Sequence, residues 1–239
     1  MAAFVQLSNP PIKEIIFTIS FNEKIDLSLL DEFKSLPHIS QKFRHVRKGI
    51  QATVERNNSG EGLNASFMND GYILADQDRN RVLQVKQGSF AFHKVREYEK
   101  FETLLREFGE YWTDLKQCTG TLTVNRISIR YLNFIEKDPD QSVEELIIIT
   151  PKHPFAENTM GLVNLKFPYR NDDNVLVNIV TAAVIDGLKE GVILDIIIQR
   201  PVENKSDSAA VFKLLSELRD VKNDLFFKSI TEKTVKKYI

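Results

Sequence analysis

Twice along this chain, a series of alternating, strand-like segments ends in one long amphipathic stretch. In residues 49–95 apolar residues recur at every second position, which is typical of strands with one buried face. In residues 98–116 they recur at spacings of three and four, which predicts a helix. Residues 161–201 and then 205–227 follow the same order. A chain of this kind buries its helical stripes against sheets, so we predict an α+β fold.

The strands are expected to be mainly antiparallel, because turn-forming sequences separate them. Turn composition occurs at residues 57–62, 69–70 and 77–80, which favours a meander over residues 49–95. The two long helices are predicted to pack on one face of the sheets. We expect the chain to form one compact unit with two halves, residues 1–135 and 136–239. The halves resemble each other in outline, so both a pseudo-duplicated and a ferredoxin-like arrangement fit this order.

Three shorter segments complete the expected fold. Residues 12–21 alternate and predict a strand, and Asp26 is the expected N-cap of the short helix that follows. The apolar run at 146–150 predicts another strand. Ser206 or Ser208 is the expected N-cap of the helix within 205–227, and Ser229 or Thr231 that of a terminal turn.

Composition limits the classes of function. The 239 residues carry a formal net charge of −1, which argues against a generally basic nucleic-acid-binding protein. Cys118 is the one cysteine, so no intramolecular disulfide is expected, as in a reducing compartment. The first residues lack the pattern of a signal peptide, and no apolar run is long enough to span a membrane. We therefore expect a cytoplasmic protein without membrane contact.

No catalytic or cofactor-binding motif stands out. The four histidines, His38, His45, His93 and His153, do not pair with each other or with Cys118 at metal-ligand spacing. Neither a nucleophile elbow, a P-loop nor a dinucleotide-binding glycine pattern occurs. We expect no metal, no cofactor and no catalytic residue.

Glu14 is a carboxylate within an otherwise apolar strand. A half-buried carboxylate is costly unless it is paired. Arg126 and Arg130 lie on one face of the strand predicted at 121–135, and either guanidinium could bind Glu14 through two hydrogen bonds. Glu14 then has two principal interpretations. It is half of a cross-strand ion pair that fixes the register, or it contacts a ligand or partner together with Arg130 in a polar cleft.

Residues 42–48 form the most basic segment of the chain. Lys42, Arg44, His45 and Arg47 lie within six positions of one another. Such a segment in a ferredoxin-like lobe resembles RNA-binding and RNA-cleaving modules, in which a histidine serves as acid or base. A solvated basic loop explains the same pattern without any ligand.

Three short motifs carry a resemblance to a known family. They comprise Pro10, Pro11, Ile12 and Glu14; Arg130, Tyr131 and Asn133; and Phe226, Phe227, Ser229, Ile230 and Thr231. On these motifs the chain resembles a sporadically distributed, uncharacterised bacterial protein family. The resemblance adds Asn133 to the candidate partner-binding residues. The patchy distribution of that family is similar to that of defence-associated genes, which is an association and not a mechanism.

The leading hypothesis is a non-enzymatic cytosolic protein that acts by macromolecular interaction. It would be an accessory or regulatory subunit, in a defence or toxin–antitoxin-type system, with a protein partner or a second copy of itself. The alternative is an RNA-binding or RNA-processing module that uses residues 42–48, with nucleic acid as the partner. A third hypothesis is a small-molecule sensor with a pocket between sheet and helices.

Overall fold

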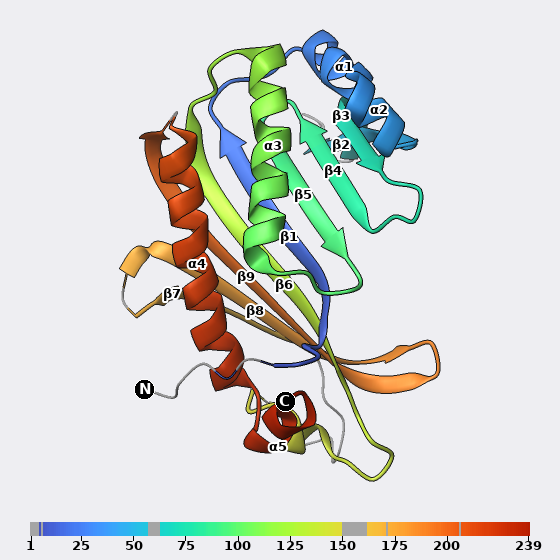
Figure 1. Ribbon diagram of the computed structural model, residues 1–239, viewed down its shortest axis with the longest axis vertical. Coiled ribbons are helices and arrows are strands. Elements are labelled where there is room, and N and C mark those ends of the chain that lie inside the picture. Colours follow the sequence, from blue (N-terminus) through green and yellow to red (C-terminus); the bar gives the residue numbers. More distant parts are fainter. Residues whose placement is uncertain (1–4, 6, 57–62, 150–161, 171, 206) are drawn as a thin grey trace.

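Nine antiparallel strands form one sheet in the computed structural model, which describes residues 5, 7–56, 63–149, 162–170, 172–205 and 207–239 (Figure 1). The strands are β1 (Ile12–Phe21), β2 (His45–Arg56), β3 (Leu63–Ala75), β4 (Arg81–Lys86), β5 (Ser89–Val95), β6 (Val124–Glu136), β7 (Val163–Tyr169), β8 (Asp172–Asp186) and β9 (Lys189–Lys205). Their order across the sheet is β2-β3-β4-β5-β1-β6-β9-β8-β7. The predicted α+β class and the antiparallel meander are confirmed.

The sheet is built outward from the pair β1–β6 at its middle. The meander β2 to β5 extends the sheet from β1, and the meander β7 to β9 extends it from β6. The last strand of each meander pairs with a central strand, β5 with β1 and β9 with β6, and then leads into a helix, β5 into α3 (Phe101–Thr119) and β9 into α4 (Ser208–Ser229). This arrangement mirrors the similarity of the two halves seen in the sequence. A duplication and a ferredoxin-like origin stay predictions.

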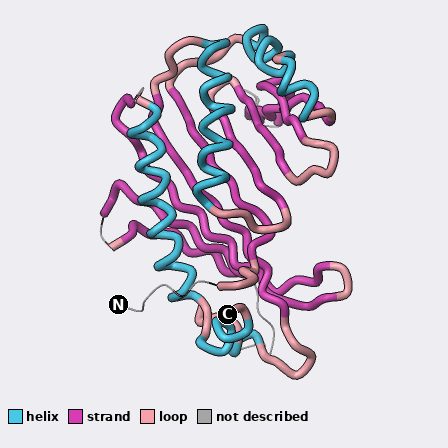
Figure 2. Tube along the Cα trace, viewed as in Figure 1, coloured by secondary structure: helices cyan, strands magenta, loops and turns pink. Residues whose placement is uncertain are grey.

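The helices cover one face of the sheet (Figures 1 and 2). Besides α3 and α4, the described residues form α1 (Leu27–Ser35), α2 (Pro37–Lys42) and α5 (Glu232–Lys237). The apolar stripe of α3 meets the inward side chains of β1 and β5. There, the rings of Phe90 and Phe108 stack at 5.4 Å, and those of Phe17 and Phe108 lie 5.6 Å apart. This aromatic cluster is the centre of the core.

The helix ends test three of the predicted caps. Asp26 caps α1, because its Oδ1 accepts a hydrogen bond from the Ser28 amide at 2.8 Å. Thr231 caps α5 in the same manner through the Thr234 amide at 3.2 Å. The prediction of Ser208 is wrong, since Asp207 is the N-cap of α4 and Ser208 is its first residue. Ser206 and the turn predicted at 57–62 lie outside the described residues.

Residues 146–149 do not form the predicted strand. Leu146 and Ile147 are consecutive and both buried, which a strand with one buried face does not allow. Ile147 makes a single β-bridge with Ile230 instead. The run is apolar because it packs under the ends of α4 and α5; its last residue, 150, lies outside the described residues.

The turn predicted at residues 69–70 is a bend within β3. The register between β2 and β3 shifts after Gly49, opposite Gly71, which has a φ of 147°. A Cβ atom on Gly71 would lie 2.0 Å from the carbonyl oxygen of Val85, so only glycine fits there. The bend therefore depends on Gly71.

A search for membrane-spanning helices among the described residues finds none that is long and apolar enough.

Candidate functional site

The face of the sheet that carries no helix has four ionisable side chains at its centre. Alternate residues of β1 point to this open face, and so do the residues directly opposite them on β5 and β6. Ile16 of β1 lies opposite His93 on one side and Arg130 on the other. Glu14 and Asp195 lie one step further along the same face. We call His93, Glu14, Arg130 and Asp195 the central quartet.

The quartet forms two pairs, and neither is the predicted one. Glu14 Oε1 lies 2.7 Å from His93 Nδ1. Arg130 makes three contacts of 2.7 to 3.1 Å with the carboxylate of Asp195, a bidentate ion pair. The prediction that Arg130 or Arg126 hydrogen-bonds Glu14 is therefore wrong. The carboxylate beside the Arg130 guanidinium is Asp195, which the neighbouring strand β9 supplies.

Glu14 and Arg130 still interact through space. The hydrogen bonds with Asp195 raise the pKa of Arg130, and the negative charge of Glu14 adds to this effect. Basic and acidic side chains thus alternate across four neighbouring strands: His93 on β5, Glu14 on β1, Arg130 on β6 and Asp195 on β9.

His93 is the least satisfied member of the quartet. Its Nε2 atom is buried and has no hydrogen-bond partner among the described residues. Glu14 orients the ring as a carboxylate orients a catalytic imidazole. However, the buried Nε2 does not reach solvent, so the pair has the geometry of a structural contact. In the described part of the chain, no group of three or more His, Cys, Asp or Glu side chains could hold a metal ion.

Arg126 lies on the same open face but stands apart from the quartet. It is exposed, and its Nη2 lies 3.4 Å from Ser20 Oγ. It borders a broad hollow of about 1110 Å³, which Thr18, Lys24 and Lys86 also line. The structure therefore separates Arg126 from Glu14.

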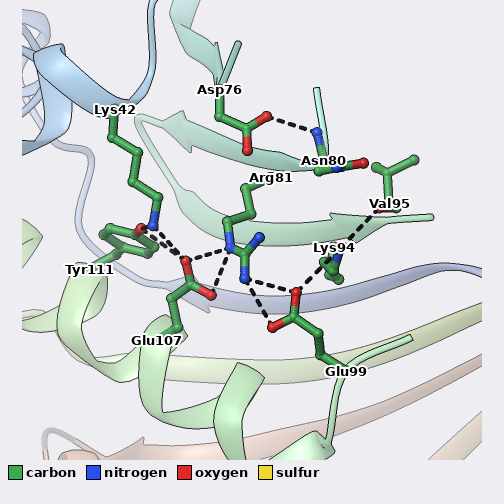
Figure 3. Close-up of polar contacts among 9 residues, drawn as sticks. All are labelled: Lys42, Asp76, Asn80, Arg81, Lys94, Val95, Glu99, Glu107 and Tyr111. Carbon is green, nitrogen blue, oxygen red and sulfur yellow. Dashed lines mark hydrogen bonds and ion pairs between the residues drawn. The ribbon is translucent and has the colours of Figure 1, made fainter. Parts of the chain in front are cut away.

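The basic segment is divided between two faces. Lys42, at the end of α2, turns to the helix layer and binds Glu107 Oε1 at 2.8 Å (Figure 3). It also donates to the hydroxyl of Tyr111. These contacts direct the Lys42 ammonium toward α3, although its side chain stays 43% exposed.

Glu107 belongs to a wider ion network beside α3, which Figure 3 shows. Arg81 Nε lies 2.8 and 2.9 Å from the two oxygens of Glu107, and Arg81 Nη2 lies 2.9 Å from both oxygens of Glu99. Lys94 Nζ lies 3.4 Å from Glu99. Burial disfavours the ionised form of Glu107, but hydrogen bonds from Lys42 and Arg81 outweigh it and hold the Glu107 pKa below its ordinary value.

The rest of the basic segment gathers at the edge of the open face. Arg44, His45 and Arg47 line a hollow of about 380 Å³ together with Arg79, which the turn between β3 and β4 supplies. The lining contains no carboxylate among its described residues. Sequence reasoning missed Arg79, because only the folded sheet brings this turn next to β2.

Asn133 lies on the opposite, helix-covered face. A register shift between Ile12 and Glu14 turns Ile12 to the helix side, where it pairs with Asn133. Asn133 is buried, and its Nδ2 donates to the carbonyls of Leu194 at 2.9 Å and Tyr131 at 3.3 Å. Strict alternation would place Ile12 on the same face as Glu14, but the bulge places them on opposite faces.

Asn133 borders a pocket of about 360 Å³ between β6, α4 and the start of α3. Lys222 of α4 projects into this pocket, is 9% exposed and makes no salt bridge or hydrogen bond among the described residues. Its Nζ lies 4.0 Å from the centre of the Tyr131 ring and 5.9 Å from that of Phe226. Burial, with the positive charge of Arg219 as a second cause, lowers the pKa of Lys222 to about 7.

The sequence did contain a signal for Lys222. The buried positions of α4 follow helical spacing, and Lys222 falls between Leu218 and Leu225 at the same spacing. A lysine within an apolar stripe is either snorkelling to solvent or buried, and the structure shows it buried.

No protein-family model matches the chain, and a search of curated proteins finds no match to it.

Proposed function

We propose that this chain is a non-enzymatic interaction protein whose open sheet face binds a protein partner. One observation carries the proposal: β9 presents the apolar residues Ile193 and Ile197, on either side of Asp195, on the face that no helix covers. Ile196 and Ile198 are fully buried under the helices, whereas Ile193 and Ile197 alternate with them toward the open face and stay half-buried. Strands with apolar residues on both faces are typical of sheets covered on both sides.

The neighbouring strands continue this apolar area. Leu132 of β6 and Val180 of β8 lie beside the outward residues of β9 and are half-buried, and Leu176 is exposed. The Arg130–Asp195 pair lies among them. An apolar surface around a few fixed polar groups is the usual composition of a protein–protein interface core. In this proposal the protein serves as an accessory or regulatory subunit.

The test is purification of the tagged chain from its native host, together with two variants. Ile197→Glu places a charge in the middle of the open face, and Leu188→Glu changes an exposed residue at the β8–β9 turn. A stoichiometric partner should co-purify with the wild type and with Leu188→Glu, and should be lost from Ile197→Glu. Circular dichroism checks that both variants are folded.

Light scattering on the pure wild-type chain decides whether the partner is a second copy. Two results contradict the proposal: the wild-type chain is a monomer and no stoichiometric partner co-purifies with it, or a partner co-purifies equally with both variants.

The hollow lined by Arg44, His45, Arg47 and Arg79 favours a second candidate function, binding of RNA. Three arginines without an opposing carboxylate supply the charge-assisted contacts that phosphates prefer. Fluorescence anisotropy with a labelled single-stranded RNA 20-mer tests it. Affinity should fall steeply from 50 to 200 mM salt, because counterions are released on binding, and should fall further in Arg47→Glu than in Lys213→Glu. Binding that is absent or insensitive to salt rules it out.

A further inference from the structure

Lys222 presents its amine to a partly open pocket, and no described residue supplies a counterion. The pocket lies on the opposite side of the sheet from the proposed protein-binding face, so it calls for a separate explanation. Its described lining includes one carboxylate, Glu102, and three basic groups, Lys100, Arg219 and Lys222. Arg219 Nη1 binds Glu102 Oε1 at 2.9 Å, which neutralises that carboxylate. Lys100 and Lys222 then leave a surplus of positive charge, and an anion would balance it.

The remaining walls are largely apolar. Leu7, Pro10 and Ile12 form one side, and Phe226 and Phe227 form another. The amide of Ser8 donates to the carbonyl of Tyr238 at 2.8 Å, so the N-terminal wall is fixed to the C-terminal end of the chain. A volume of about 360 Å³ is at the lower end of small-molecule pockets, roughly 300 to 1,000 Å³.

We propose that this pocket binds a small organic carboxylate, with the carboxylate on Lys222 Nζ and an apolar body against Phe226, Phe227 and Ile12. The ammonium lies over Tyr131, which fixes its position, and no described residue accepts a hydrogen bond from it. A carboxylate uses those donors, and its apolar body displaces water from the surrounding walls. The ligand enters between structural elements that both halves of the chain provide, since β6, α3 and α4 all line the pocket.

Binding should depend on pH because the free amine loses its proton near neutrality. The facing charged or titratable groups are Tyr98, Lys100 and Glu102 at the start of α3, Tyr131 on β6 and Arg219 on α4. Burial raises the pKa of both Tyr98 and Tyr131, so the phenols stay neutral over this range. The lining has no histidine among its described residues. Affinity for a carboxylate should therefore fall between pH 6 and pH 9 as the Lys222 ammonium deprotonates.

Calorimetric titration of the full chain with carboxylates, and with neutral analogues of matched shape, tests the proposal. The probes are octanoate and 2-naphthoate, and their neutral analogues are octanol and 2-naphthalenemethanol. At pH 6.5 at least one carboxylate should bind, at least tenfold more tightly than its neutral analogue. Lys222→Met should lose at least tenfold in affinity, while Lys213→Met, an exposed lysine of the same helix, should bind as the wild type does.

Three outcomes overturn the proposal. No carboxylate binds, a neutral analogue binds as tightly as its carboxylate, or Lys222→Met retains the affinity of the wild type. The pH series on the wild type is independent of any variant, and an affinity that is constant from pH 6 to pH 9 would also refute it. Since the open-face test uses other residues and another readout, either proposal can fail alone.

Discussion

Two regions beside the long helices treat buried positive charge in opposite ways. Next to α3, Lys94 is 3% exposed and Arg81 is largely buried, yet both have carboxylates within reach, Glu99 and Glu107. Next to α4, Lys222 is also buried, and among the described residues its ammonium contacts aromatic rings and no carboxylate. A buried ion is costly unless it is paired. The network therefore has a structural explanation, and Lys222 calls for a ligand.

The strongest test of this contrast is Arg81→Met. This change leaves Glu107 and Glu99 with one cation each, Lys42 and Lys94, at the edge of the core. Breaking a buried pair costs about 3–5 kcal/mol, and since Arg81 is not fully buried we expect about 3 kcal/mol of destabilisation. Urea unfolding at pH 7 measures it, with Arg47→Met as the unpaired control. A loss below about 1 kcal/mol would show that the network is no more stabilising than surface pairs.

Lys222→Met should stabilise the folded protein, whereas Arg81→Met should destabilise it. Methionine fills a similar volume without a charge, so the free energy of unfolding at pH 6 should rise by on the order of 2–4 kcal/mol. Thermal and urea unfolding of the ligand-free protein measure the gain. If the variant is less stable than the wild type, the amine is favourable in the folded state and the contrast with Lys94 disappears.

The advantage of Lys222→Met should also vanish with rising pH. The pKa of Lys222 is about 7 in the folded protein and about 10.4 in an unfolded chain. Below pH 7 the amine is charged in both the folded and the unfolded state, so the full cost of burying its charge lowers the stability of the wild type. Between those two values the unfolded chain binds a proton that the folded chain lacks, so wild-type stability rises with pH relative to the variant. The difference in free energy of unfolding between Lys222→Met and the wild type should shrink from pH 6 to pH 8 and pH 10. A difference that stays constant contradicts the lowered pKa of Lys222.

A smaller effect is expected on the open face. Arg130→Met leaves the carboxylate of Asp195, which is 8% exposed, without its bidentate partner. Because the Arg130 side chain is 39% exposed, solvent screens the pair, and we expect a loss of roughly 1–2 kcal/mol. Asp195→Asn on the Arg130→Met background should restore part of this loss. A double variant no more stable than the single one would show that Asp195 is not the group left unpaired.

The smallest effect should come from the basic hollow. Arg47 makes no salt bridge among the described residues, so Arg47→Met should change the free energy of unfolding by less than about 0.5 kcal/mol. The same urea series measures it. A larger loss would show that the hollow is a structural contact rather than a free basic surface.

Periodicity predicted the elements of this fold well, because it depends only on which face is buried. The burial of Ile15, Phe17 and Ile19 under the helices follows from alternation alone. Alternation failed at residues 146–149, where consecutive Leu146 and Ile147 pack under helix ends. That packing depends on residues distant in the sequence, so the local periodicity of the sequence does not predict it.

The candidate site was less predictable, since it depends on strand order. Glu14 was correctly recognised as a paired, half-buried carboxylate, but its partner lies on β5 and not on β6. Charge complementarity alone favoured arginine, but His93 and Arg130 both lie opposite Ile16, and Arg130 binds Asp195 of β9 while Glu14 pairs with His93. Lys42 illustrates the same limit: the basic segment was interpreted as one surface, yet the end of α2 directs this residue toward Glu107 of α3.

The pairing of β1 with β6 at the middle of the sheet also has a consequence for biosynthesis. During translation β1 can pair with β5 as soon as the first meander has emerged, but its other edge has no neighbour until β6 has been made. An unpaired apolar strand edge is a template for wrong association between nascent chains. The interval between β1 and β6, which ends with helix α3, is therefore when this chain is most exposed to aggregation and has most need of a chaperone.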